Sequence, residues 1–262
     1  MDNLLIQDAQ GVRILTLNRP DRLNAFDDGL SSNLIQALND ASRDDDVRVV
    51  IITGRGRGFS SGLDLSTFTN GDLSPTSRFG RLDELEWVGR LIESVVHNDK
   101  PIIAAINGVA AGAGLSLALA CDFRFMSEEA KLTTGYIRRA LSPDAGMTYF
   151  LPRLVGHTKA MELILTGRDV DAAEADRLGL LNQVVEGSQL LETVQAFARE
   201  LASGPPIAMT LSKRLVYSSY DTPLVPQLKN ELAFIRQCFG TDDVREGIQA
   251  MMEKRKPNFQ GR

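Results

Sequence analysis

Cysteine is scarce in this chain, which has two thiols, Cys121 and Cys238, far apart in the sequence. They form no C-x-x-C pair, which excludes a disulfide framework and a zinc site and favours a reducing, cytoplasmic compartment. No apolar run approaches the roughly 20 residues of a membrane helix. The first residues, MDNLLIQDAQ, lack the basic start and long apolar core of a signal peptide. We therefore expect a soluble, untargeted protein with no membrane partner.

Long blocks of one charge are also missing. The net charge of −5 comes from interspersed acidic and basic residues, so there is no basic face of the kind that nucleic acid binding requires. Histidine is limited to His97 and His157, each at an expected helix end, where a capping or surface role is the simpler interpretation. No metal-ligand spacing is present, and we expect no metal site.

What the sequence does contain is an alternation of apolar runs and amphipathic segments, which predicts an α/β fold. Residues 3–17 predict two short strands, and a helix is expected over about 27–44. Buried strands are expected at VRVVIITG, KPIIAAING and CDFRFMS, with helices over about 81–98 and at GAGLSLALA. From residue 188 the pattern is helical, with segments near 188–202, 206–218, 224–239 and 241–253. We therefore divide the chain into a spiral α/β core, 1–187, and a C-terminal helical region, 188–262.

Two turns rich in glycine and small residues follow predicted strands. They are FSSGLDL at 59–65 and NGVAAGAGLSLA at 107–118. The second opens a helix whose first N–H groups have no partner within the helix. If the turns face each other, their amides form a cradle for one oxygen, although such turns often serve only close packing. A nicotinamide site is not favoured, because the third glycine of G-x-G-x-x-G and its acidic partner are missing.

The segment TTGYIRRALSPDAG at 133–146 can be interpreted in two ways. Ser142, Pro143 and Asp144 have the chemistry of a helix start, with Ser142 as N-cap and Pro143 at the first helical position. Asp144 could instead be a proton carrier with Tyr136 beside it, and both roles are compatible. Tyr136 could donate a hydrogen bond to a substrate or pack with its hydroxyl satisfied. Arg138 and Arg139 are expected to be solvated or to contact acids.

Several long stretches resemble the enoyl-CoA hydratase/isomerase, or crotonase, superfamily over essentially the whole chain. The resemblance implies a spiral of ββα units and a C-terminal helical trimerisation region, with a homotrimer or dimer of trimers as the assembly. It also implies an acyl-CoA thioester as substrate, with coenzyme A as part of the substrate and no separate cofactor. The stretches are LNRPDRLNAF, VVIITGRGRGFSSGLDL, KPIIAAINGVAAGAGLSLALACDFRF, LSPDAGMTYFLPRLVG, AMELILTGRDVDAAEADRLGLLNQVV and EGIQAMMEKRKPNF.

The same resemblance assigns candidate roles to individual residues. The backbone N–H groups of Leu63 and Ala113 are implied to hold the thioester oxygen, where negative charge develops during enolate chemistry. Asp64 is expected to brace that loop, and Lys254 to reach a neighbouring subunit. The implied substrate and coenzyme A contacts are Arg22, Asn24, Ala25, Ser61, Gly62, Asp64, Leu65, Gly112, Ser116 and Lys254.

The chain departs from the family pattern at two positions. Typical hydratases have glutamates where Ser116 and Tyr136 stand, so hydration by a carboxylate pair is not favoured. The isomerase branches have an acid at the position of Asp144, and one carboxylate suffices to move a proton between two carbons. The sequence thus favours an enoyl-CoA isomerase with Asp144 as the proton shuttle, Tyr136 as its companion and Ser116 as a small spacer. Alternatives are hydration, decarboxylation, thioester hydrolysis, and binding without catalysis.

Overall fold

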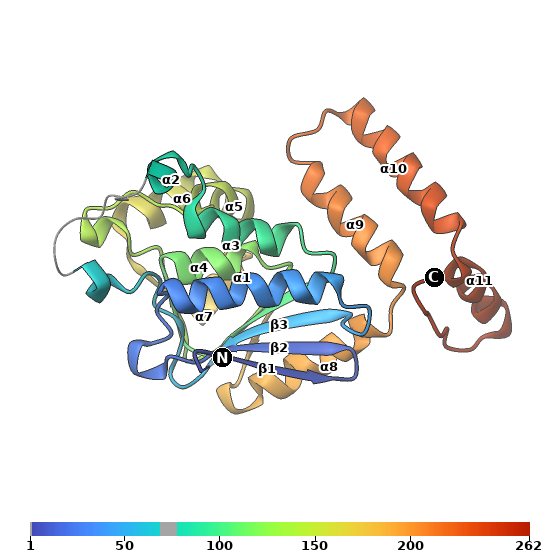
Figure 1. Cartoon of the computed structure of the whole chain (residues 1–262), viewed down its shortest axis with the longest axis horizontal. Coiled ribbons are helices and arrows are strands. Elements are labelled where there is room, and N and C mark those ends of the chain that lie inside the picture. Colours follow the sequence, from blue (N-terminus) through green and yellow to red (C-terminus); the bar gives the residue numbers. More distant parts are fainter. Residues whose placement is uncertain (1, 69–77) are drawn as a thin grey trace.

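The computed structural model describes residues 2–68 and 78–262, and it contains two β-sheets (Figure 1). The larger sheet has six strands in the order β1-β2-β3-β5-β7-β10, of which β1 and β2 form an antiparallel hairpin and the others are parallel. The N-terminal hairpin and the three buried strands expected from the sequence are confirmed. The strands are β1 Leu4–Ala9, β2 Val12–Leu17, β3 Val49–Gly54, β5 Ile102–Ile106, β7 Phe123–Ser127 and β10 Gln183–Val185.

The smaller sheet has four strands in the order β4-β6-β8-β9. Each of its first three strands directly follows a strand of the larger sheet, so that β3 leads to β4, β5 to β6 and β7 to β8. Successive passes of the chain therefore add one strand to each sheet, which is the spiral of ββα units that the sequence predicted. The strands are β4 Gly58–Ser60, β6 Val109–Ala111, β8 Lys131–Thr133 and β9 Asp169–Asp171.

Helices cover both faces of the larger sheet, because successive side chains of a strand point to opposite faces. In β3, Val50 and Ile52 pack in the main core with α1 and α3, whereas Val49 and Ile51 pack in a second cluster with α8. Figure 1 shows α1 and α8 on opposite sides of the strands. The helices of the core are α1 Asp28–Arg43, α2 Arg78–Leu82, α3 Glu86–Val96, α4 Ala113–Ala120, α5 Met147–Val155, α6 His157–Thr166 and α7 Ala172–Arg177; short 3₁₀ turns are η1 Pro20–Arg22, η2 Leu65–Phe68, η3 Ile137–Arg139 and η4 Gly187–Gln189.

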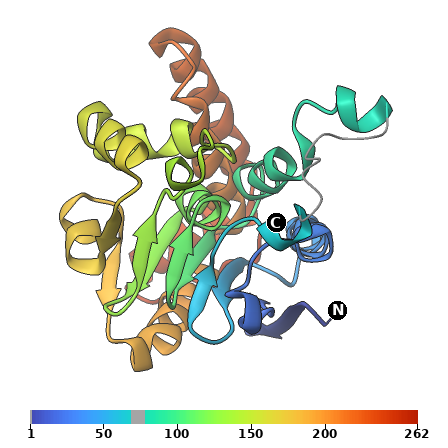
Figure 2. The same ribbon diagram turned by 90° about the vertical axis from the view of Figure 1, so that its left-hand side faces the viewer.

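The C-terminal region is helical, and its four helices lie within two residues of the predicted positions. They are α8 Leu190–Ala202, α9 Pro206–Ser218, α10 Leu224–Phe239 and α11 Asp242–Glu253. Figures 1 and 2 show α10 extending away from the sheets. In Figure 1 its antiparallel partner α9 lies between α10 and the core, with α11 at the far end. Helix α9 contacts the core directly, since Lys213 forms an ion pair with Asp122 at 2.8 Å. In the described part of the chain, none of the helices combines the length and the apolar character needed to cross a membrane.

Two local predictions are wrong. Ser142, Pro143 and Asp144 do not begin a helix, because α5 starts at Met147 with Gly146 as its N-cap and no side-chain cap. Ala145 and Gly146 both have positive φ, 50° and 76°, which breaks the chain direction before the helix. The helix expected over 81–98 is also interrupted, and it forms α2 and α3. The sequence also predicts that the polar segment 66–80 lines much of an acyl pocket, and most of that segment lies outside the described residues.

Candidate active site

In the turn after β4, the backbone N–H of Leu63 points away from the neighbouring segment at Phe26. Leu63 forms an isolated parallel bridge with Phe26. Phe26 N–H donates to the Gly62 carbonyl at 2.7 Å, and Asp64 N–H donates to the Phe26 carbonyl at 2.9 Å. Because alternate amides of an extended segment point in opposite directions, the Leu63 N–H faces the pocket side. No acceptor for it is found among residues 2–68 and 78–262.

The second amide belongs to Ala113, the first residue of α4. Its N–H has no acceptor within the helix, and the N-cap Gly112 has no side chain to supply one. The helix packs tightly on β4, since a Cβ on Gly114 would lie 2.4 Å from the Ser60 carbonyl oxygen. A dry, closely packed helix start therefore directs a free amide into the pocket.

The two turns converge, which is the arrangement that an oxygen cradle requires. A Cβ placed on Gly62 would lie 2.8 Å from the Ala111 carbonyl oxygen and 3.2 Å from the Ala113 nitrogen. Gly62 also has φ of 88°, which side chains other than glycine rarely adopt. Glycine is therefore required there both for conformation and for space. The amides of Leu63 and Ala113 can bind one oxygen and stabilise negative charge that develops on it.

An acid and a tyrosine form the opposite wall. The Tyr136 hydroxyl donates to Asp144 Oδ1 at 2.8 Å. Ser116, on α4, is fully buried, and its hydroxyl lies 3.4 Å from the Tyr136 hydroxyl and 3.5 Å from the Asp144 carbonyl oxygen. The Tyr136 ring lies next to the N-terminus of α4, since a Cβ on Gly112 would be 3.9 Å from its Cζ. Asp144, Tyr136 and the two free amides therefore belong to one site.

The protonation of Tyr136 follows from its surroundings. Burial raises the pKa of Tyr136 well above its ordinary value, and the negative charge of Asp144 raises it further. The phenol is therefore neutral at physiological pH and acts as a hydrogen-bond donor. It donates to one carboxylate oxygen of Asp144, so the other oxygen can accept a proton from a substrate. Tyr136 itself is poorly suited to remove a proton.

These groups line a pocket of about 230 Å³. Sequence reasoning missed Trp87, the single tryptophan, which reaches the pocket from α3 and contacts Phe26 with ring centroids 5.6 Å apart. Its position on an amphipathic helix was indistinguishable from that of an ordinary core aromatic. The lining residues are Ser61, Gly62, Leu63, Leu65, Trp87, Val88, Gly112, Ala113, Gly135, Tyr136, Arg139, Leu141, Ser142 and Asp144.

Two residues expected to contact substrate, Asn24 and Ala25, are buried outside the pocket lining. Asn24 is fully buried, and its amide nitrogen donates to the Gly58 and Arg55 carbonyls at 2.7 and 3.0 Å. Its side-chain oxygen accepts from the Arg19 amide at 2.8 Å, so Asn24 joins the loop after β2 to the β3–β4 segment and is not part of the pocket lining. Ala25 is also buried outside the lining. The sequence signal for a turn at this position is the asparagine itself, because asparagine favours the left-handed conformation that Asn24 adopts, with φ of 55°.

Three further residues expected to contact substrate lie outside the pocket lining. Arg22 is exposed near the pocket mouth, where its carbonyl accepts from the Ser61 hydroxyl at 3.3 Å. Lys254 ends α11, at the opposite end of the long axis from α2, and it does not meet the site of its own chain (Figure 1). Ser116 is covered by Tyr136 and is not part of the lining. A role for Lys254 therefore requires a second copy of the chain.

Asp64 lies behind the oxygen-binding turn. Its carboxylate accepts from the Ser66 hydroxyl at 2.6 Å and forms an ion pair with Arg19 at 2.9 Å. These contacts, the Ser66 hydroxyl first, lower the pKa of Asp64. The charged side chain ties residues 64–66 to the loop before α1, which is the bracing position expected from the sequence.

Among the described residues, no cluster of histidine, cysteine and acidic side chains could hold a metal ion.

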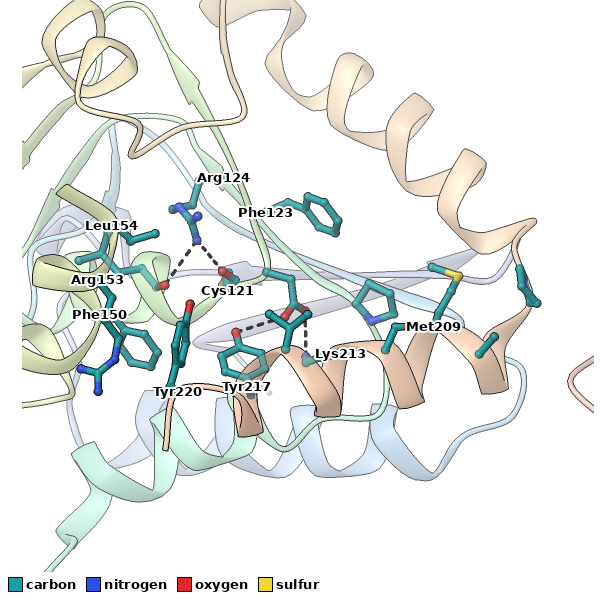
Figure 3. Close-up of a pocket in the computed structure, with 17 residues that line it drawn as sticks. Cys121, Phe123, Arg124, Phe150, Arg153, Leu154, Met209, Lys213, Tyr217 and Tyr220 are labelled. Atoms are coloured by element: carbon teal, nitrogen blue, oxygen red, sulfur yellow. Dashed lines mark hydrogen bonds and ion pairs between the residues drawn. The ribbon is translucent and has the colours of Figure 1, made fainter. Parts of the chain in front are cut away.

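A second cavity, of about 570 Å³, lies between α9, α5 and β7 and shares no residue with the first (Figure 3). Its floor contains the ion pair of Lys213 and Asp122 at 2.8 Å, and Tyr217 donates to the same carboxylate at 3.2 Å. Burial raises the pKa of the nearby Cys121 thiol to about 12, so the thiol is protonated and is not a nucleophile.

A family model described as enoyl-CoA hydratase/isomerase matches residues 7–262 of the sequence. The chain belongs to the enoyl-CoA hydratase/isomerase family. It is an enzyme of this family, whose members act on acyl-CoA thioesters. The fold and family implied by the sequence motifs are thereby confirmed.

Individual relatives have different printed activities. The chain is 37% identical to 1,2-epoxyphenylacetyl-CoA isomerase of Escherichia coli over 100% of both chains. It is 35% identical to crotonyl-CoA hydratase of Syntrophomonas wolfei over 98% of each. The crystal structure of an enoyl-CoA hydratase from Bacillus anthracis superimposes with a TM-score of 0.92 at 35% identity, covering 99% of this chain and 100% of that one. Family membership therefore does not choose between isomerisation and hydration.

Proposed function

We propose that this enzyme is an enoyl-CoA isomerase that shifts a double bond with Asp144 as a single proton shuttle. The observation that carries the proposal is that Asp144 is the one carboxylate among the described residues lining the pocket. It shares that pocket with the Leu63 and Ala113 amides. The likeness to an isomerase of E. coli supports this choice, and the likeness to hydratases keeps hydration as the competing function.

The reaction proceeds through an enolate. Asp144 removes a proton from the carbon between the thioester and the double bond of a 3-enoyl-CoA. The electron pair of that C–H bond moves into the thioester, and the Leu63 and Ala113 amides stabilise the charge on its oxygen. Protonated Asp144 then returns the proton to the fourth carbon, which leaves the double bond between the second and third carbons. No proton is gained or lost overall, so one carboxylate is sufficient.

Hydration makes a different demand on the site. Two carboxylates can orient and activate water together, but the neutral hydroxyls of Ser116 and Tyr136 stand where a second carboxylate would be needed. Tyr136 cannot replace it as a base, because its pKa is raised. One carboxylate held by a phenol therefore favours proton transfer over water addition.

The test compares two substrates and two variants. A 3-enoyl-CoA and a 2-enoyl-CoA are incubated separately in D₂O, and products are followed by absorbance and mass. We expect the 3-enoyl-CoA to isomerise with deuterium incorporation, and Asp144→Asn to lose most of this activity. Asp45→Asn, an exposed acid after α1, is the matched control. Hydration of the 2-enoyl-CoA as the dominant reaction, or exchange that survives Asp144→Asn, would refute the assignment. Neither isomerisation nor exchange by any form would indicate a binding protein.

We further propose a homotrimer or a dimer of trimers, built on the C-terminal helices. Their outer faces carry large exposed apolar side chains, including Leu224 and Met251, each 72% exposed. Patches of this kind on a monomer mark interaction surfaces, and a neighbouring copy would bring Lys254 toward another site. Sedimentation equilibrium tests this: Leu224→Glu with Met251→Glu should reduce the oligomer, and a wild-type monomer would refute it.

A further inference from the structure

Arg139 is the one cation among the described residues that line the proposed acyl pocket. It lies on η3, the short turn that also follows Tyr136, and its amide donates to the Tyr136 carbonyl at 2.9 Å. Its guanidinium Nη1 donates to the Gly135 carbonyl at 3.1 Å. A Cβ on Gly135 would lie 3.4 Å from that nitrogen and 3.9 Å from the Gly112 amide. The guanidinium is therefore anchored on Gly135, a residue of the pocket lining that packs close to the Gly112 backbone.

The adjacent Arg138 has a different environment. It forms an ion pair with Asp169 at 2.9 Å and is not part of the lining. For Arg139, no carboxylate partner is found in residues 2–68 and 78–262, and its contact there is a neutral carbonyl. The two neighbouring arginines thus differ, because Arg138 is paired with an acid outside the pocket, whereas Arg139 lines the pocket, is exposed, and has no ion-pair partner among the described residues.

Arg139 is a charged residue in a pocket wall that is otherwise largely apolar. Leu65, Trp87, Val88 and Leu141 provide an apolar surface for an acyl chain. A plain hydrocarbon chain gains nothing from a guanidinium, whose fork of N–H donors matches a carboxylate. An anionic acyl group would also meet the charge of Asp144 in this pocket, and a nearby arginine offsets that repulsion.

We propose that Arg139 is a specificity-determining residue that selects acyl-CoA thioesters whose acyl chain carries a carboxylate. This inference rests on the proposed use of the pocket by an acyl-CoA, but not on the isomerase chemistry. The guanidinium would bind the acyl carboxylate while the thioester oxygen lies at Leu63 and Ala113. Unsaturated dicarboxylic acid monothioesters are then the preferred substrate class.

The experiment measures binding of saturated thioesters, which have no double bond to move. Calorimetry compares succinyl-, glutaryl- and adipyl-CoA with butyryl-, pentanoyl- and hexanoyl-CoA, matched in length. We expect at least one diacid to bind more tightly than its matched monoacid. In Arg139→Leu this preference should fall about 10-fold, the effect of losing a charge-assisted hydrogen bond at a partly solvated site. Arg139→Lys should retain part of it, and added salt should weaken it.

Arg138→Gln is the matched control, because it removes the same charge one residue away, outside the pocket. Three results would overturn the proposal: no diacid preference in the wild type, an equal loss of preference in Arg138→Gln, or equal weakening of diacid and monoacid in Arg139→Leu. The last would mean that the guanidinium contacts the coenzyme A portion. A clear diacid preference, together with no double-bond movement in the separate 3-enoyl-CoA assay, would refute the isomerase and leave the carboxylate recognition intact.

Discussion

The hydrogen bond from Tyr136 to Asp144 allows a decisive double-mutant cycle. Tyr136→Phe removes the hydroxyl that donates to Asp144 Oδ1 at 2.8 Å and preserves the buried ring. A hydrogen bond to a charged group contributes about 1.5–3 kcal/mol. Asp144 is exposed, so water replaces part of this, and about 1–2 kcal/mol is lost. That corresponds to a decrease of about 5- to 30-fold in kcat/KM.

Asp144→Asn should cost more, because it removes the base itself. General-base catalysis contributes typically about 10²–10⁴-fold, and no other carboxylate of the described lining can replace it. If Tyr136 acts only through Asp144, adding Tyr136→Phe to Asp144→Asn changes the rate little further. The effects are then strongly non-additive, as expected for groups that act as a unit.

Solvent-deuterium exchange at the acyl α-carbon is the assay, because it detects very slow proton transfer. Tyr149→Phe is the matched control, since Tyr149 also donates to an aspartate, Asp221, at 3.2 Å but lies outside the pocket. It should leave kcat/KM unaltered. If Tyr136→Phe lowers exchange by the same factor with and without Asp144, the phenol acts on the substrate directly, and our reasoning about its role is refuted.

Two further predictions concern the oxygen-binding turns. Gly62→Ala places a methyl group 2.8 Å from the Ala111 carbonyl oxygen, so we expect it to lower both turnover and the thermal midpoint. Gly179→Ala has a similar φ with nothing within 4 Å, and it should cost only the conformational strain of about 1–2 kcal/mol; equal effects of the two would contradict the steric argument. Asp64 has a lowered pKa in the folded state, so its stabilisation is present above the unfolded value of about 4 and is lost as pH falls through the lower folded value. Urea unfolding of Asp64→Asn should show a shallower loss of stability below about pH 4 than the wild type, and parallel curves would contradict this.

The sequence predicted most elements because their signals are local. The helix at α1 shows an apolar face at helical spacing, and Asp27 caps it by accepting from the Leu30 amide at 2.8 Å. In the same way Thr241 caps α11. The alternation of short buried strands and helices was enough to indicate a spiral α/β core. Element positions were therefore predictable wherever period and capping chemistry agreed.

The site was less predictable because it depends on contacts between distant segments. The sequence located two glycine turns, but only their approach at Gly62 and Ala113 shows that one oxygen could bind both amides. Asn24 has a chemically versatile side chain, and only the structure shows that it joins the Arg19 amide of its own loop to the Arg55 and Gly58 carbonyls of the β3–β4 segment. Trp87 carried no local signal that separated a pocket wall from a core position.

The failure to predict the start of α5 has a functional explanation. A carboxylate in the first turn of a helix is held by the helix amides, which would reduce its availability to a substrate. Here Ala145 and Gly146 turn the chain with positive φ, and α5 begins without a side-chain cap. The left-handed conformation of Ala145 costs about 1–2 kcal/mol, and it prevents Asp144 from capping the helix. Asp144 instead accepts a hydrogen bond from Tyr136 and lines the pocket. The residue that violates the local rule is the one to which we assign the chemistry, as expected where function and local preference conflict.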